Sequence, residues 1–260
     1  MILSNDCIDF VEKRYNLKYM DVDDAILEYN KLEDFAPDGN VWDHLDDRDT
    51  ISEGAHLVMR LVTQYYLTKA FRGMKIDLNN PNVKEDIASG NLGTPGRMAK
   101  VFVGANLHDD SELGCGRWTP KPRIARFPNN YKMNVPITKR IDIVSNCSHH
   151  FIPFTTLSRP DSYAVISYVP DKYAIGISKL QRVADHISRR FFLQEDLTKA
   201  LYDEICQVAD TESVYIKLVN LTHGCESYRG SQTDDGSFTS TYYGGAFKDM
   251  TLRSQVDQLN

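Results

Sequence analysis

The sequence predicts an α+β fold, because a helical N-terminal region is followed by strand patterns, a long helical block and one more strand. Residues 133–146 alternate apolar and polar side chains, and 163–169 form a short apolar run, as strands do. Residues 178–209 carry apolar side chains at helical spacing, and 214–221 again have the pattern of a strand. With 42% hydrophobic and 25% charged residues in 260, the composition argues against collagen-like, fully disordered and coiled-coil chains.

The first element, residues 1–50, is expected to be an acidic N-terminal arm of short helices. It holds 14 acidic and 5 basic residues, a net charge of −9, whereas the whole chain has a net charge of −6. The remaining residues therefore carry +3, and an anionic ligand is expected to bind there. The overall balance gives no electrostatic reason to expect a nucleic acid or an anionic membrane as a partner.

Residues 51–130 are expected to form a helical region that ends in a long basic loop. Apolar side chains recur at helical spacing over 52–72, and Thr94 and Pro95 fit the N-cap and the first position of a second helix. Residues 114–130 are rich in Gly, Pro and Arg without a period, as surface loops are. The loop could meet an anion, although a solvated basic loop is the commoner outcome. Its basic residues include Arg117, Lys121, Arg123 and Arg126.

The sequence contains no apolar run near the ~20 residues of a membrane span, and its first ten residues do not resemble a signal peptide. A cytoplasmic protein without a membrane partner is therefore expected. The five cysteines are an odd number at scattered spacings, which suits reduced thiols or a metal site better than a disulfide framework.

Two short motifs place thiols and imidazoles at the ends of predicted strands. In CSHH (147–150), the cysteine and the second histidine have the spacing that lets one tight turn present both side chains to a metal ion. In HGC (223–225), residues two apart at a strand end emerge on the same face. Each motif alone is weak, but together they offer the sulfur and nitrogen ligands that Zn²⁺ prefers. Three such ligands would leave a position open for water, as in a catalytic zinc site.

The segment ISKLQR (177–182) predicts a helix start that also suits a phosphate. Ser178 and Gln181 fit a Ser-x-x-Gln capping box. Lys179 and Arg182 lie on one face of the first turn, where cations oppose the helix dipole but, with the free backbone N–H groups, would bind a phosphate. The alternative is a basic helix start that faces water; the electrostatic conflict favours the phosphate site.

These motifs resemble those of the GTP cyclohydrolase I family, zinc enzymes that convert GTP to 7,8-dihydroneopterin triphosphate and formate. The resemblance covers about residues 82–248 and is strongest from 141 onwards, where the order and spacing of the motifs also match. The matching segments are TPGR (94–97), SNCSHHFIPF (145–154), YAVISYVP (163–170), IGISKLQR (175–182), LQEDL (193–197), HGCESYRG (223–230) and GGAF (244–247).

The resemblance implies a zinc centre with an acid/base pair beside it. By this resemblance the zinc ligands are Cys147, His150 and Cys225, and the catalytic residues are His149, His223 and Ser178. The ligand set agrees with the donor types found above, and a bound zinc ion would lower the pKa of a water molecule to about 7.

The resemblance also implies how GTP would bind. Glu195, with Gln194 beside it, would anchor guanine, because a carboxylate accepts hydrogen bonds from both N1–H and the exocyclic amine. Lys179, Arg182 and Arg229, with Ser178, would hold the triphosphate.

The fold that the resemblance implies is the tunnelling fold, an antiparallel four-stranded sheet with two helices on one face, preceded by an N-terminal helical region. Residues 131–260 would form this catalytic domain. Such subunits join edge to edge into pentameric barrels, which removes the open edges of a small sheet, and two rings stack into a homodecamer. The active sites would then lie between subunits.

Two other interpretations belong to different classes. The chain could be a non-catalytic, zinc-stabilised module that binds guanine nucleotides, or an enzyme of the same fold that acts on another pterin or 7-deazaguanine precursor. His149 and His223 are not needed to hold the metal, so their presence favours the enzyme. Folate, biopterin and 7-deazaguanine routes all remain open downstream.

Overall fold

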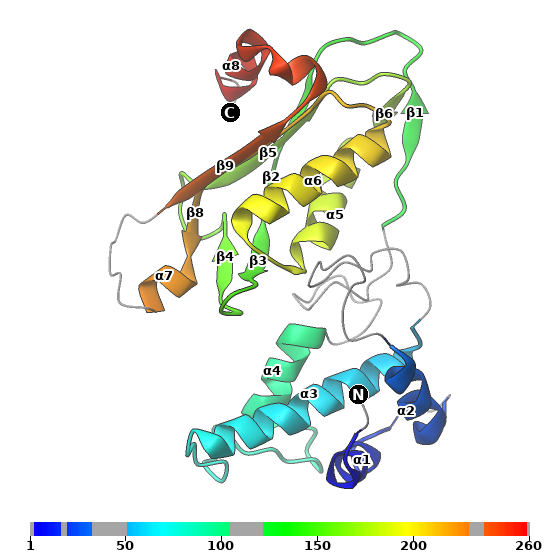
Figure 1. The fold of residues 1–260 in the computed structure, drawn as a ribbon, viewed down its shortest axis with the longest axis vertical. Coiled ribbons are helices and arrows are strands. Elements are labelled where there is room, and N and C mark those ends of the chain that lie inside the picture. The colour runs from blue at the N-terminus through cyan, green and yellow to red at the C-terminus, as the bar shows by residue number, and fades with distance from the viewer. Residues whose placement is uncertain (1–2, 17–19, 33–50, 105–121, 229–236, 259–260) are drawn as a thin grey trace. The chain divides into compact units, whose positions relative to one another are not determined.

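The computed structural model describes residues 3–16, 20–32, 51–104, 122–228 and 237–258. They belong to two compact units, Met1–Lys121 and Pro122–Asn260, each of which is described by itself (Figure 1). The end of the predicted acidic arm lies outside the described residues, as do Arg117 and Lys121 of the predicted basic loop. Within the described part of the chain, no helix has the length and apolar character needed to span a bilayer.

The first unit consists of helices packed around a small apolar core. Its helices are α1 (Asn5–Glu12), α2 (Val22–Lys31), α3 (Glu53–Gly73) and α4 (Gly93–Val103). The side-chain oxygens of Ser4, Asp21 and Ser52 cap α1, α2 and α3, so the helices begin where their first free N–H groups find acceptors. The core side chains include Cys7, Val11, Ala25, Val58, Leu61, Val62 and Tyr65.

Two polar contacts connect the helices of the first unit. Glu85 accepts hydrogen bonds from Nε and Nη2 of Arg14, at 2.8 and 2.6 Å, and from Nε2 of Gln64 at 2.9 Å. These bonds join the turn after α1, helix α3 and the segment before α4. Nearer the start of α3, Nε2 of the buried His56 lies 3.0 Å from the carbonyl oxygen of Val103, at the end of α4.

The predicted N-cap at Thr94 is wrong, because α4 begins at Gly93. The N–H of Thr94 donates to the carbonyl oxygen of Val83 at 3.0 Å, so the backbone before the helix replaces a side-chain cap. Gly93 has φ +62°, and a Cβ there would lie 2.7 Å from backbone atoms of Val83 and Glu85. Only glycine fits this close approach.

The second unit is built on a mixed sheet with helices, as the α+β prediction requires. Its strands are β1 (Arg126–Pro128), β2 (Ile137–Ile141), β3 (Val144–Cys147), β4 (Pro153–Thr155), β5 (Tyr163–Tyr168), β6 (Tyr173–Ile175), β7 (Phe191–Phe192), β8 (Val214–His223) and β9 (Phe238–Tyr243). Its helices are α5 (Ile177–Ser188), α6 (Gln194–Ala209), α7 (Gly224–Tyr228), the 3₁₀ turn η3 (Gly245–Lys248) and α8 (Met250–Gln258).

The strand β8 is the centre of the main sheet and pairs with three others. Strands β2, β5, β8 and β9 pair antiparallel in that order, and the last two residues of β8 pair with β4. Strand β4 pairs with β3, which pairs in parallel with β7. This sheet therefore has seven strands where the resemblance implies four, and β1 pairs with β6 apart from it. The three added strands, β3, β4 and β7, are short and continue the sheet from the end of β8.

Helices α5 and α6 cover one face of this sheet (Figure 1). Helix α6 packs against β8 and β9, and α5 packs against β2 and β3. On the other face, Val165 and Tyr215 pack with Phe247 of η3 and Val256 of α8. Successive side chains of a strand point to opposite faces, and because both faces are covered, β5 is almost entirely buried and so is the first part of β8.

The predicted capping box in α5 is wrong. The helix begins at Ile177 with Gly176 as N-cap and without a side-chain cap. Gln181 instead accepts from the backbone N–H of Asp142 at 3.0 Å and donates to its carbonyl oxygen at 2.9 Å. The partner comes from the turn after β2, so sequence spacing alone could not reveal this competing bond.

Candidate metal centre and adjoining cavity

The two predicted metal-binding motifs meet at the ends of β3 and β8. Cys147 is the last residue of β3, His150 lies in the turn that follows, and Cys225 is in the first turn after β8. One ligand atom from each of the three side chains lies within 4.8 Å of the others. Sγ of Cys147 lies 4.0 Å from Nδ1 of His150.

A tight turn brings Cys147 and His150 to the same side. The carbonyl oxygen of Cys147 accepts from the N–H groups of His150 and Phe151, at 3.3 and 2.8 Å, and Phe151 has φ +54°. Gly224 brings Cys225 close to this turn, because a Cβ at Gly224 would lie 2.7 Å from Cγ2 of Ile152. The backbone conformation of both motifs therefore brings the three side chains close together.

The donor set fits a borderline-soft divalent cation such as Zn²⁺. Two thiols and one imidazole are ligands that zinc prefers, and three protein ligands leave a fourth position for water or substrate. Burial raises the pKa of the Cys225 thiol, and the neighbouring Cys147 raises it further. Two thiolates at this distance repel each other, so a cation between them would remove the conflict.

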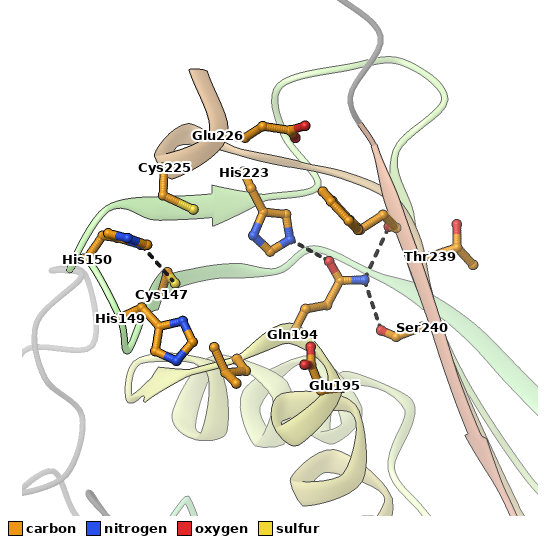
Figure 2. A pocket seen from close by; sticks show the side chains of 12 residues that line it. Cys147, His149, His150, Gln194, Glu195, His223, Cys225, Glu226, Thr239 and Ser240 are labelled. Atoms are coloured by element: carbon orange, nitrogen blue, oxygen red, sulfur yellow. Dashed lines mark hydrogen bonds between the residues drawn. The ribbon is translucent and has the colours of Figure 1, made fainter. Parts of the chain in front are cut away.

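A cavity of about 680 Å³ opens beside the cluster (Figure 2). Figure 2 shows the three ligands grouped together and Gln194 between His223 and Ser240. The described part of the lining holds two carboxylates, Glu195 and Glu226, and neither lysine nor arginine. Its residues are Cys147, His149, His150, Leu193, Gln194, Glu195, His223, Cys225, Glu226, Phe238, Thr239 and Ser240.

His223 is the most constrained imidazole of the cavity. Its ring stacks on Phe154, with centroids 4.8 Å apart and planes at 7°, and meets the edge of Phe238 at 5.1 Å. Its Nε2 lies 2.7 Å from Oε1 of Gln194. Burial lowers the pKa of His223, and the charges of Glu226 and Glu195 oppose that shift only in part. His149, by contrast, is exposed.

The structure brings together seven of the predicted site residues. They are Cys147, His149, His150, Gln194, Glu195, His223 and Cys225. Ser178, Lys179 and Arg182 lie in the first two turns of α5 and do not line this cavity. Helix α5 is about 18 Å long, and its C-terminal end leads to β7, which pairs with Cys147. The three residues therefore lie toward the N-terminal end of α5, away from the metal-binding motif. Arg229 lies outside the described residues.

The sequence analysis missed the residues that surround His223. Phe238, Thr239 and Ser240 belong to β9, whose segment FTSTYY is rich in aromatic and β-branched residues. That composition is a strand signal, and it could have placed β9 beside β8. Phe154 and Glu226 carried no separate signal, since each simply follows a motif.

Comparison with known proteins gives one consistent result. The family model described as GTP cyclohydrolase I matches residues 81–260. GTP cyclohydrolase 1 of Blochmanniella pennsylvanica is 35% identical over 162 residues, which cover 62% of this chain and 67% of that protein. GTP cyclohydrolase 1 of Flavobacterium johnsoniae is 30% identical over 187 residues, 71% of this chain and 74% of that protein. The Porphyromonas gingivalis enzyme of the same name is 32% identical over 168 residues, 64% and 79% of the two chains.

Proposed function

This chain belongs to the GTP cyclohydrolase I family, and from that membership we propose that it is a zinc-dependent enzyme that hydrolyses GTP to 7,8-dihydroneopterin triphosphate and formate. The observation that carries the proposal is the convergence of Cys147, His150 and Cys225 beside a cavity that also holds two further histidines. A structural zinc site would need a closed set of four ligands, whereas this cluster offers three and opens onto a cavity.

Cys147, His150 and Cys225 would hold the zinc ion. When bound, the ion supplies a Lewis acid and makes water a nucleophile near neutral pH, which suits hydrolysis at C8 of the purine. The buried Cys147 fixes one ligand on the rigid end of β3, and the more exposed His150 completes the set from the turn. The cavity beside the three side chains would give water access to a bound ion.

His149 and His223 would move the protons. Burial lowers the pKa of His223, which favours the neutral ring that can accept a proton. His149 lines the same cavity and is exposed to solvent. Proton transfer to N7 of the purine and the later rearrangement of the ribose need both an acceptor and a donor.

Glu195 would select guanine. It lines the cavity at the first turn of α6, with its carboxylate free to accept from the N1–H and exocyclic N–H groups. Adenine offers no N1–H donor, so the same carboxylate would discriminate against it. Gln194, the other predicted guanine contact, also lines the cavity, but its side-chain amide is already bonded to His223, Phe238 and Ser240.

We also propose that the triphosphate site is completed by another copy of this chain. A triphosphate needs cations, and the described lining of the cavity has carboxylates only. The predicted cations Lys179 and Arg182, with Ser178, lie toward the opposite end of α5, and a second subunit could bring them to the cavity.

The sheet supports such an assembly. Among the described strands, β2 pairs only with β5, and β9 pairs with β8, so both outer edges can accept a strand of a neighbour. Edge-to-edge closure of a tunnelling fold into pentamers, stacked as a decamer, is the assembly we propose. Sedimentation or light scattering of the purified chain measures it.

One experiment tests the activity and the metal together. The purified chain is assayed for zinc per chain and incubated with GTP, while formate release and dihydroneopterin triphosphate are followed by absorbance and mass. We expect both products from the wild type, and neither from Cys225→Ala, which should also lose zinc. Zinc with bound but unchanged GTP would contradict the enzyme and favour a nucleotide-binding module.

A further inference from the structure

We propose that Gln194 is a positioning residue that fixes one tautomer of His223, with a proton on Nε2 and a free lone pair on Nδ1. The inference deepens the proposed function, because it names the atom of His223 that accepts the proton. It rests on hydrogen bonds that determine which end of the Gln194 amide faces the imidazole.

The amide of Gln194 can be oriented in only one way. Its Nε2 donates to the carbonyl oxygen of Phe238 at 3.2 Å and to Oγ of Ser240 at 2.9 Å. Turning the amide over would place Oε1 against the Phe238 carbonyl, so two acceptors would face each other. Both N–H donors of the amide are therefore used on β9, and Oε1 must face His223.

The hydroxyl groups of Thr198 and Ser240 form hydrogen bonds whose direction agrees with this orientation of the amide. Oγ1 of Thr198 donates to the carbonyl oxygen of Gln194 at 2.8 Å, one turn earlier in α6. Because a hydroxyl has only one proton, Thr198 must accept from Ser240, whose oxygen lies 2.6 Å away. Ser240 therefore donates its only proton to Thr198, and toward Gln194 it can act only as an acceptor. The backbone carbonyl of Gln194 thus sets the direction of the whole chain of bonds.

Burial on the α6 side limits the freedom of this arrangement. Gln194 and Thr198 are 3% and 1% exposed, whereas their partners on β9 are half-buried or exposed. Phe154 and Phe238 hold the imidazole ring from its face and from its edge. A half-turn of the ring about its Cβ–Cγ bond would put Cε1 in the place of Nε2 and lose the bond to Gln194. Figure 2 shows the second ring nitrogen on the side of Cys225.

The bond to Gln194 determines which nitrogen of His223 carries the proton. Oε1 has no proton to give, so the 2.7 Å contact requires a proton on Nε2 of His223. In the neutral ring Nδ1 is then the sole acceptor, and it is the nitrogen left for substrate or for water in the cavity. Without the amide both tautomers become accessible, and part of the protein would present an N–H where an acceptor is needed.

The test uses zinc-loaded, full-length protein and begins with ¹⁵N NMR of the histidine side chains, assigned by comparison with His223→Gln. In the wild type we expect Nε2 of His223 to be protonated and Nδ1 unprotonated. In Gln194→Met, which keeps the length of the side chain but removes the amide, we expect a mixture of tautomers. Gln255→Met, on the exposed face of α8, is the matched control and should leave the His223 signals unchanged. A proton on Nδ1 in the wild type would overturn the proposal.

Kinetics separate positioning from substrate binding. For Gln194→Met we expect kcat to fall about 10-fold or more, with KM for GTP within about 2-fold and zinc per chain unchanged. A raised KM with unchanged kcat would instead mean that Gln194 binds substrate, and would overturn the proposal. Gln194→Glu retains an acceptor for Nε2–H, so we expect it to keep the wild-type tautomer and to recover part of kcat.

Two outcomes distinguish this proposal from the proposed function. If the wild type releases no formate from GTP, the activity is wrong, and the tautomer measured by NMR still decides the role of Gln194. If Gln194→Met does not fold, the NMR of Gln194→Glu decides instead, because loss of the single tautomer in that variant would contradict the proposal.

Discussion

Phe154 and His223 are opposite each other on β4 and β8, and their rings are stacked with centroids 4.8 Å apart and planes within 7°. The pair lies at the point where the short strands beside the metal cluster join the main sheet. Phe154 is completely buried, so one side chain both fills the core and fixes the plane of the His223 imidazole. Stability and the geometry of the proposed site are therefore coupled at this contact.

The first prediction concerns this stack. Phe154→Ala removes a buried ring, and we expect the free energy of unfolding of the second unit to fall by about 3–5 kcal/mol. Urea denaturation followed by circular dichroism measures the change. Phe127→Ala is the control, since Phe127 is 57% exposed and its loss should cost less than about 0.5 kcal/mol. Equal effects of the two substitutions would contradict a structural role for the stack.

The second prediction separates metal binding from proton transfer. We expect Cys147→Ala to lose both zinc and activity, because it removes a ligand from a cluster of three. His149→Ala should keep its zinc and lose about 10²–10⁴-fold in kcat, the usual contribution of an acid or base. Zinc per chain is measured by elemental analysis and kcat by formate release. Loss of zinc from His149→Ala would show that this histidine is a ligand instead.

The third prediction concerns the pH dependence of stability in the first unit. Burial lowers the pKa of His56 in the folded chain, whereas the unfolded chain keeps a value of about 6.5. As the pH falls through about 6.5, the unfolded chain therefore binds a proton that the folded chain does not. The free energy of unfolding should fall with decreasing pH, by at most about 1.4 kcal/mol per pH unit, until the folded pKa is passed.

Hydrogen exchange of the α3 and α4 amides between about pH 7.5 and about pH 5.5 measures this local stability. His56→Gln can still donate to the Val103 carbonyl but does not titrate, so its slope should be smaller by about one proton. An identical slope in the two proteins would mean that carboxylates alone cause the pH dependence.

The fourth prediction compares two ion pairs of different burial. The side chains of Arg14 and Glu85 are 14% and 24% exposed, and Glu85 also accepts from Gln64. Glu85→Ala removes the carboxylate that accepts from Arg14 and from the buried Gln64, and we expect it to destabilise the first unit by about 2–3 kcal/mol. Lys172→Ala breaks a pair with Asp210 whose side chains are 69% and 50% exposed, and should cost less than about 0.5 kcal/mol. Urea denaturation of both variants gives the comparison.

The sequence was most informative where chemistry and local spacing coincide. Cys147 and His150 share one turn, and Cys225 follows a strong strand pattern, so their convergence could be predicted from the motifs and the order of the strands. The α+β order and the positions of β5, α5, α6 and β8 were equally predictable, because each has a clear hydrophobic period.

The surroundings of His223 could not be predicted, because they depend on distant pairings. Gln194 meets Ser240 through contacts 46 residues apart, which require the register of β8 and β9, including the irregularity between Leu218 and Leu221. The capping box of α5 failed for the same kind of reason, since Gln181 bonds with Asp142 in a distant turn. Local sequence rules predict which hydrogen bonds a side chain can make, but its tertiary partners determine which of them form.

The meeting of Cys147 and Cys225 also has a thermodynamic consequence. The two thiols stand at positions 147 and 225 of the sequence and lie together only after β4 has joined β3 to β8. An ion held by both thiols would therefore bind the folded chain alone, and its binding free energy would add to the stability of this unit. If the chain holds zinc as proposed, release of zinc to a chromogenic chelator should follow the opening of the β3–β4–β8 corner.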